Sequence, residues 1–471
     1  TSGHADLADL YEEKIVKKDN KLFYAYDNTL KPVTEKQITI NYKKDDHFIA
    51  KTFTTYFTHH GPVMASRNGK WLSLKENNRS LKGLLQSWLR TKAKNFSEFE
   101  KTMEMRSNTS DNTVYADDKG NIAYWHGNFI PKRNPKYDWS QPVDGTTSAT
   151  EWKGIHELNE IVHVYNPSTG WIQNCNSTPF TVSGKASPDR NKYPVYMAPD
   201  EEQPRSINAI RLLSSQNNFT LDKMIAVGYN TYLAAFDILL PSLFIAYDEQ
   251  QRQQSTIKAD LDEAVQLLKL WNRKSAKNSV ATTLAIEWAS KLKLPVQTPA
   301  DAKLQINHFE ALSKFISPKE KIKLLEDVIK ELNRDFGTWR VTWGEMNRYQ
   351  RLTDDLQQKF DDTKQSYPVG MASSVWGCIP SFGTVKPEGL KHRYGINGNS
   401  FVAAVEFVRK DSYGGKKIKA KSIVTGGEGM HPSSKHFLDQ AQMYIDGKFK
   451  DVLFYKEDVL KYVEKKYHPG E

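Results

Sequence analysis

The polar side chains of Asn174, Asn176 and Ser177 form the stretch of this sequence that is best suited to chemistry. An aromatic and an aliphatic residue precede them and Pro179 follows, so we expect the polar residues to lie at the end of a short buried strand. An Asn amide offers two N–H groups, which can stabilise negative charge on a carbonyl oxygen. The alternative is an Asx turn, in which these side chains bond only to nearby backbone.

A second group of oxygens lies near the start of the chain. Asp6 and Asp9 are close in sequence, and the main-chain carbonyl of Ala8 lies between them. Calcium prefers several oxygen ligands, so these residues could begin a calcium site. The alternative is the start of a helix or turn, where Asp is common.

Two adjacent histidines, His59 and His60, end a segment of alternating hydrophobicity. Paired imidazoles could bind a metal ion, but we expect no third ligand nearby. We therefore expect both histidines to pack at a strand end.

The composition bounds the class of protein. The chain has 471 residues, 38% of them hydrophobic, and a formal net charge of +10. This is enough apolar material for a sizeable core. The lysines occur as short pairs separated by acids, which indicates a solvated surface rather than a nucleic-acid site. No Walker, zinc-finger or RNP motif is present, and we expect neither nucleic acid nor an organic cofactor.

The ends and the cysteines add little. No apolar run is long enough for a membrane span, and the start is not a signal peptide. The first residue is not Met, so we expect a processed or truncated product. Cys175 and Cys378 lack the spacing of a metal knuckle.

Periodicity predicts strands at both ends of the chain and helices between them. We expect strands over residues 36–64, a helix over 81–105 with Trp88 and Leu89 inside, and a hairpin over 112–125. Helices are expected over 220–290 and 301–333, with strands at 401–408 and 422–424. The prediction is one large α+β domain, 1–471, which comprises mainly strands over 1–215, a helical insertion over 216–340, and returning strands with a C-terminal helix over 341–471.

Several stretches, in order along the chain, resemble the penicillin acylase family of N-terminal-nucleophile (Ntn) hydrolases. They are Thr1–Glu13, His60–Val63, Ala116–Trp125, Tyr165–Pro179, Arg205–Leu213, Trp343–Glu345 and Gly427–Gln440. The last stretch departs from the usual pattern, with Glu428, Gly429 and Met430 where Gln, Ser and Gly are common, and Lys435 in place of a Pro. The resemblance implies the αββα sandwich of these hydrolases, here incomplete, with exposed strand edges that can pair with another chain.

The resemblance also implies an amidohydrolase that forms an acyl-enzyme. In the family a catalytic Ser at the start of the β chain attacks the acyl carbonyl, and its own α-amino group acts as the base. An α-amine has a pKa of roughly 7.7–8.0, so it can accept a proton near neutral pH. A main-chain N–H and an Asn side chain stabilise the oxyanion.

Site residues are transferred position by position. Asn176 matches the oxyanion-hole Asn, and Ser2 matches the residue that donates its main-chain N–H. Arg205 matches an arginine near the substrate and the nucleophile's amine, where a fixed positive charge helps to keep that amine neutral. The resemblance implies structural calcium on Asp6, the Ala8 carbonyl and Asp9, with Asp189 and Pro142 as further candidates.

The resemblance implies further that the nucleophilic Ser lies upstream of the residues printed here, and that a separate α chain lies further upstream still. Thr1 could itself be an N-terminal nucleophile, but it falls on the oxyanion-hole segment. The resemblance implies an N-acyl substrate, for which β-lactam side chains, acyl-homoserine lactones and other N-acyl amines are the alternatives. We expect a periplasmic location, and a non-catalytic binding or structural module of the envelope is the alternative function.

Overall fold

The computed structural model describes residues 8–77, 80–108, 111–253, 258–296, 298, 305–408, 417–468 and 470. Contacts divide the chain into two compact units, Thr1–Asp200 and Glu201–Glu471, and each is described by itself. The predicted domain boundaries stay a prediction. The predicted α+β class is confirmed, because both helices and sheets are extensive among the described residues.

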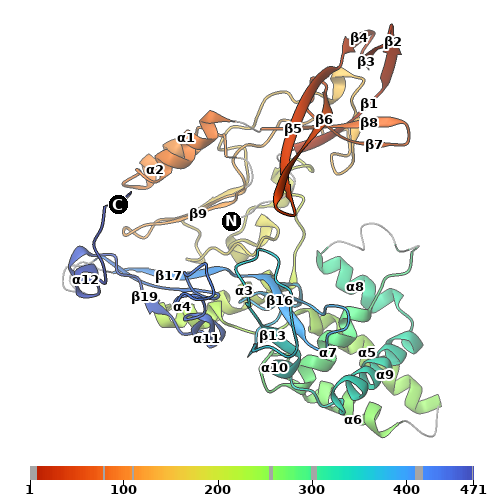
Figure 1. Cartoon of the computed structure of the whole chain (residues 1–471), viewed down its shortest axis with the longest axis vertical. Helices are drawn as coiled ribbons and strands as arrows, with labels where there is room; N and C mark the ends of the chain where they lie inside the picture. The colour runs from red at the N-terminus through yellow and green to blue at the C-terminus, as the bar shows by residue number, and fades with distance from the viewer. Residues whose placement is uncertain are drawn as a thin grey trace. The chain divides into compact units, whose positions relative to one another are not determined.

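The first unit consists mainly of short strands and loops (Figure 1). Its elements are β1 (Ala8–Glu13), β2 (Ile15–Lys18), β3 (Lys21–Tyr26), β4 (Thr29–Pro32), β5 (Thr34–Lys44), β6 (His47–Phe57), β7 (Val63–Arg67), β8 (Lys70–Glu76), α1 (Leu81–Arg90), α2 (Phe96–Met103), β9 (Thr113–Ala116), β10 (Ile122–Trp125), β11 (Val143–Asp144) and β12 (His163–Tyr165). Four 3-10 turns follow or interrupt them, at Ser148–Thr150, Pro179–Thr181, Gly184–Ala186 and Arg190–Lys192.

Four sheets organise this unit. Strand β1 is central in the order β11-β1-β8-β7, antiparallel to β8 and parallel to β11. The other sheets are β12-β10-β9, β2-β3-β4 and the long hairpin β5-β6. The strands predicted over 36–64 and the hairpin over 112–125 are thus confirmed, with Ile38 opposite Phe53 as alternation requires.

Helix α1 corrects one prediction. It lies within the predicted segment, but Trp88 is 62% and Leu89 38% exposed, so neither is inside. The buried residue of this helix is Gln86, whose amide donates to Asn128 Oδ1 at 2.7 Å and accepts from the Ser107 N–H at 2.9 Å. A buried polar group with both partners satisfied is stable, and apolar spacing alone does not tell which face a neighbour covers.

The second unit begins with helices and ends with short strands. Its elements are α3 (Pro204–Ser214), α4 (Leu221–Gly228), α5 (Ala235–Gln253), α6 (Ala259–Leu270), α7 (Val280–Lys291), α8 (Gln305–Phe315), α9 (Pro318–Phe336), α10 (Trp343–Met346), β13 (Asn347–Tyr349), β14 (Tyr367–Pro368), a 3-10 turn at Ser374–Trp376, β15 (Phe382–Val385), β16 (Arg393–Gly398), β17 (Phe401–Phe407), β18 (Ile418–Val424), α11 (Ala441–Ile445), β19 (Lys450–Asp451) and α12 (Lys456–Lys461). Its sheets have the orders β14-β13-β16-β15 and β17-β18-β19.

The largest core of the described residues lies in this second unit. Helices α5 and α7 contribute fully buried side chains such as Phe236, Leu243 and Trp288, and α9 adds Leu325. Burial of each large apolar side chain stabilises the fold by about 1.5–3 kcal/mol. The helices predicted over 220–290 and 301–333 correspond to α4–α9 (Figure 1).

Candidate active site

The stretch around Asn176 is a loop, which corrects the prediction of a buried strand. No strand is assigned over 166–178, and Asn176 has a φ of +58°. Asn174 Oδ1 accepts the main-chain N–H of Asn176 at 2.8 Å, so the segment is an Asx turn. An Asn tolerates the left-handed conformation better than most residues, which explains its place at this sharp bend.

Two anchors hold this turn in place. The main-chain N–H of Gln173 donates to the Val182 carbonyl at 2.8 Å, and Ser183 Oγ donates to the Trp171 carbonyl at 2.7 Å. The 3-10 turn Pro179–Thr181 follows directly, with Pro179 buried at its first position. A loop fixed at both sides keeps the Asn side chains in a defined place.

Three buried polar atoms beside Asn176 lack a hydrogen-bond partner among the described residues. They are Gln173 Oε1, Asn174 Nδ2 and Ser177 Oγ. An unsatisfied buried donor or acceptor costs about 1–3 kcal/mol, and native proteins keep few of them. These atoms give the turn polar hydrogen-bonding capacity that the described residues do not use.

Arg205 lies in the first turn of α3, after Pro204 at the first helical position. Its side chain is half-buried, and its positive charge acts on the thiol of Cys378. Burial nevertheless dominates there and raises the pKa of Cys378 to about 12. Arg205 belongs to the second unit and Asn176 to the first, and Ser2 lies outside the described residues.

The predicted calcium ligands have other partners where the structure describes them. Asp9 is 5% exposed, and its Oδ2 accepts Arg133 Nε at 2.8 Å and Trp152 Nε1 at 2.6 Å. Arg133 is also 5% exposed, so a buried guanidinium already compensates this carboxylate. These contacts do not fit a calcium ion at Asp9 Oδ2.

The other candidates do not change this result. Asp189 Oδ1 accepts the Asn191 N–H at 3.0 Å and caps the 3-10 turn Arg190–Lys192. Ala8 begins β1, Pro142 precedes β11, and Asp6 lies outside the described residues. Calcium stays a prediction, and no step proposed below depends on it.

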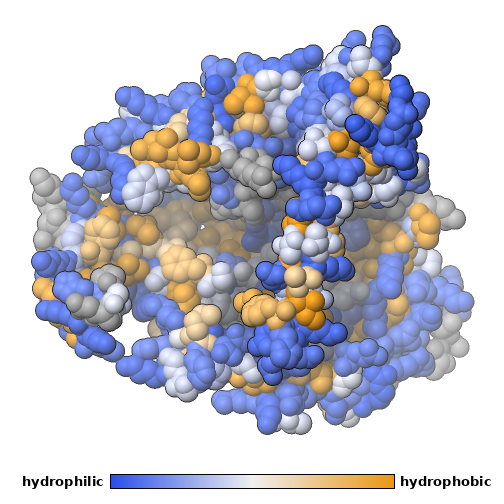
Figure 2. Space-filling view, turned by 45° about the horizontal axis from the view of Figure 1, so that its top comes forward, coloured by the Kyte–Doolittle hydropathy of each residue, from blue (hydrophilic) through white to orange (hydrophobic). Residues whose placement is uncertain are grey.

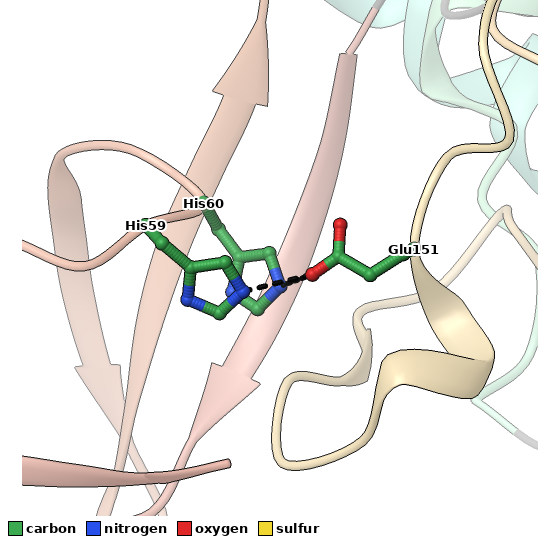
Figure 3. Close-up of side chains that lie close together, drawn as sticks. All are labelled: His59, His60 and Glu151. Carbon is green, nitrogen blue, oxygen red and sulfur yellow. Dashed lines mark hydrogen bonds and ion pairs between the residues drawn. The ribbon is translucent and has the colours of Figure 1, made fainter. Parts of the chain in front are cut away.

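Sequence reasoning missed a cluster that the fold assembles at His59 and His60. Both Nε2 atoms face one oxygen of Glu151, at 2.8 Å from His59 and 3.1 Å from His60 (Figure 3). Glu151 follows the 3-10 turn Ser148–Thr150, 91 residues after His60. The expectation that no third ligand is near is therefore wrong, and no local sequence signal could have revealed Glu151.

Electrostatics tie this cluster together. Burial alone would raise the pKa of Glu151, but hydrogen bonds from His59, His60 and Lys75 outweigh it and lower that pKa. Burial would lower the pKa of His60, but hydrogen bonds to Glu13 and Glu151 outweigh it and raise that pKa. The site thus favours a positive charge at His60.

Comparison with known proteins decides the family. A sequence model described as penicillin amidase matches residues 1–461, nearly the whole chain.

The chain belongs to the penicillin amidase family.

Two relatives in this family illustrate the match. Penicillin G acylase of Escherichia coli is 29% identical over 183 residues, which is 38% of this chain and 21% of that protein. The structure of a thermostable penicillin G acylase from Alcaligenes faecalis superposes with a TM-score of 0.66 at 18% identity. It matches 99% of this chain and 87% of that chain, which shows the shared Ntn-hydrolase-type fold.

A membrane span is not found in the part of the chain that the structure describes. None of its helices combines the length and the apolar character needed to cross a bilayer.

Proposed function

We propose that this member of the penicillin amidase family hydrolyses the amide bond of N-acyl compounds through an acyl-enzyme. The observation that carries the proposal is the family match over 1–461, within which Asn176 lies in a fixed polar turn. The Ser2 main-chain N–H and the Asn176 amide form the oxyanion hole in this proposal.

The chemistry of the turn supports this role. A tetrahedral intermediate places a full negative charge on the former carbonyl oxygen, and preorganised donors stabilise it without further reorganisation. The main-chain N–H of Asn176 donates to Asn174 Oδ1 at 2.8 Å and so fixes the main chain of Asn176. This hydrogen bond limits the positions that the side-chain amide of Asn176 can take. Loss of one oxyanion-hole donor typically lowers kcat by about 10²–10³-fold.

Arg205 has a positioning role in the proposal. A fixed guanidinium near the nucleophile's α-amine disfavours the protonated amine, so the amine stays available as the base. Pro204 and the bond from the Gln203 N–H to Ser206 Oγ define the start of α3 and so fix the Arg205 main chain.

The nucleophile belongs, in this proposal, to a β-chain segment that joins the residues described here, together with an α chain. Exposed apolar surface supports such partners. The two strands of the β5-β6 sheet each keep one open edge. Helix α1 exposes an apolar face, which is formed by Leu81, Leu84, Leu85, Trp88 and Leu89. Apolar side chains gather in patches on the surface shown in Figure 2.

Localisation in the bacterial periplasm is part of the same proposal and follows family resemblance alone. The acyl group also remains to be assigned: β-lactam side chains, acyl-homoserine lactones and simpler N-acyl amines are the classes to compare.

The test is stopped-flow hydrolysis of N-acyl 4-nitroanilides by the assembled protein, with acyl chains of increasing length. We expect a burst of 4-nitroaniline equal to the enzyme concentration, followed by slower turnover, because an acyl-enzyme accumulates. Absence of any turnover across the whole series of N-acyl 4-nitroanilides would refute the proposal. That result would favour the non-catalytic envelope module instead.

A further inference from the structure

The cluster at His59 and His60 combines five side chains: the two histidines, Glu13, Glu151 and Tyr24. His60 Nδ1 lies 2.8 Å from Glu13 Oε1, while its Nε2 lies 3.1 Å from Glu151 Oε1. His59 Nε2 reaches the same Glu151 oxygen at 2.8 Å, and its Nδ1 lies 3.1 Å from the Tyr24 hydroxyl. Three potential ligand atoms, two imidazole nitrogens and one carboxylate oxygen, thus lie within 4.8 Å of one another (Figure 3).

The local sequence builds this arrangement. Thr58 and Gly61 exchange main-chain hydrogen bonds of 3.0 and 3.2 Å, which makes a tight turn around the two histidines. Gly61 has a φ of +140°, and a Cβ there would lie 2.1 Å from the Leu74 carbonyl oxygen. Only glycine fits this position. The Tyr11 ring stacks on His60 at 3.8 Å and fixes its plane.

Both ring nitrogens of His60 face carboxylate oxygens, but a neutral imidazole can donate a proton from only one of them. A carboxylate only accepts, so His60 Nδ1 must donate its proton to Glu13. In a neutral imidazole the Nε2 atom then carries a lone pair, and that lone pair faces Glu151 Oε1. Two electron-rich atoms at 3.1 Å repel each other unless a cation lies between them.

The charges of the cluster point the same way. Glu13 is fully buried, and its Oε2 has no partner among the described residues. Glu151 Oε2 pairs with Lys75 Nζ at 2.5 Å, so one ammonium faces two carboxylates. An uncompensated buried carboxylate is costly, and one further positive charge removes that cost. A divalent metal ion bound between the histidines and Glu151 supplies such a charge.

We infer that His59 Nε2, His60 Nε2 and Glu151 Oε1 bind a divalent transition-metal ion of the zinc class, with Glu13 orienting His60 from behind. A His-His-carboxylate set suits zinc, whereas calcium and magnesium prefer oxygen ligands alone. A carboxylate such as Glu13, which accepts the hydrogen bond of the far ring nitrogen of a ligating His, is a usual outer-shell partner in zinc sites.

The distances are close to those that zinc requires. Zinc bonds of about 2.0–2.2 Å in tetrahedral geometry separate two ligand atoms by roughly 3.3 Å. The observed separations of 2.8 and 3.1 Å reach this value when the side chains open by a few tenths of an ångström. His59 and Glu151 are 27% and 19% exposed, so solvent reaches the cluster from their side.

This ion has a structural consequence. It joins the turn after β6 to the loop after β11, two segments that no strand pairing connects directly. We expect it to stabilise the first unit whether or not the protein hydrolyses amides, so its test is independent of catalysis.

The experiment measures zinc bound to the full assembled protein after removal of any affinity tag and of metal by chelation. Isothermal titration with Zn²⁺ at pH 7.5 should show one site in the parent. Glu13→Gln should weaken binding about 10–100-fold, as loss of an outer-shell partner does. His59→Ala and Glu151→Gln should each abolish that site. The matched control is His436→Ala, which removes an exposed His paired with Asp439 and should leave binding unchanged.

Cobalt substitution provides a second measurement that does not depend on the variants folding. Co²⁺ bound to the parent should give intense visible d–d bands of a four-coordinate site, and Zn²⁺ should displace it. No zinc site in the parent, or equal affinity in the His59→Ala variant, would overturn the inference. The first result would mean that a proton alone fills the cluster, and the second that zinc binds adventitiously elsewhere.

Discussion

The buried pair of Asp9 and Arg133 gives the sharpest stability prediction. Arg133→Met keeps the length of the side chain but removes its charge, which leaves the Asp9 carboxylate, 5% exposed, without its guanidinium. Breaking a buried pair in this way costs about 3–5 kcal/mol. The Trp152 N–H at 2.6 Å stays as a neutral donor and compensates only in part.

This cost converts into a thermal shift. For a unit of about 150–250 residues, 1 kcal/mol lowers the midpoint by roughly 2–4 °C, so Arg133→Met should lower the first transition by about 6–20 °C. The double variant Asp9→Leu with Arg133→Met should be more stable than Arg133→Met alone, since it removes both charges. Differential scanning calorimetry measures all three proteins.

The same assay tests calcium. If Arg133 compensates Asp9, addition of calcium or of a calcium chelator to the zinc-free parent leaves its midpoint unchanged. A chelator that lowers the midpoint by several degrees, with recovery on adding calcium, would refute this reasoning and support the calcium site expected from resemblance. An Arg133→Met midpoint within about 2 °C of the parent would also refute the compensation of Asp9 by Arg133.

Three further predictions concern other parts of the fold. Gly61→Ala should destabilise the first unit by roughly 1–3 kcal/mol in urea unfolding, because the new Cβ meets the Leu74 carbonyl. Gly69→Ala should cost less, because Gly69 has a φ of +75° but no atom within 4 Å of the new Cβ, and equal costs would contradict the steric argument. Burial raises the pKa of Cys378 to about 12, so its thiol should resist iodoacetamide at pH 8 until urea unfolds the chain. Peptide mass spectrometry measures this labelling, and rapid labelling of Cys378 in the folded protein would contradict the prediction. Burial opposes ionisation of Asp362, but hydrogen bonds from the Lys391 N–H, Tyr394 and His392 outweigh it and lower the pKa of Asp362 below its usual value. Asp362→Asn should therefore cost about 1–3 kcal/mol of stability at pH 7, and progressively less as the pH falls through the pKa of the folded state. A cost independent of pH would argue against this stabilisation by the ionised carboxylate.

Much of the secondary structure follows from local patterns. The alternation of Ile38 and Ile40 with polar residues produces β5, and the Gly-containing turn between β9 and β10 marks a hairpin. These features depend on neighbouring residues, so sequence periodicity reports them directly. The helices of the second unit are equally local.

Features that depend on distant contacts escaped prediction. Trp88 and Leu89 have helical spacing, but no described neighbour buries them. The residues before Asn174 suggest a strand, yet Gly170 at φ +75° and the Asx bond to Asn176 make a loop. The cluster at His59 and His60 needs Glu151 from a segment 91 residues away, which only the tertiary fold brings to His60.

For the candidate active site, the family resemblance supplied more than the residues did. The family match spans Asn176 and Arg205, whose roles stay predictions; each lies in a separate unit, and Ser2 lies outside the described residues. The sequence did indicate the polar character of the turn. The structure shows in addition that Asn174 Nδ2 has no hydrogen-bond partner among the described residues.

The most direct test of the central claim is kcat/KM for hydrolysis of an N-acyl amide by the assembled protein and by its Asn176→Ala variant. The control is Asn191→Ala, which removes an exposed amide of the same unit. We predict a loss of about 10²–10³-fold for Asn176→Ala and no change for the control, since in the proposed mechanism Asn176 stabilises the oxyanion and Asn191 does not. Equal rates in all three proteins would contradict the assignment of Asn176.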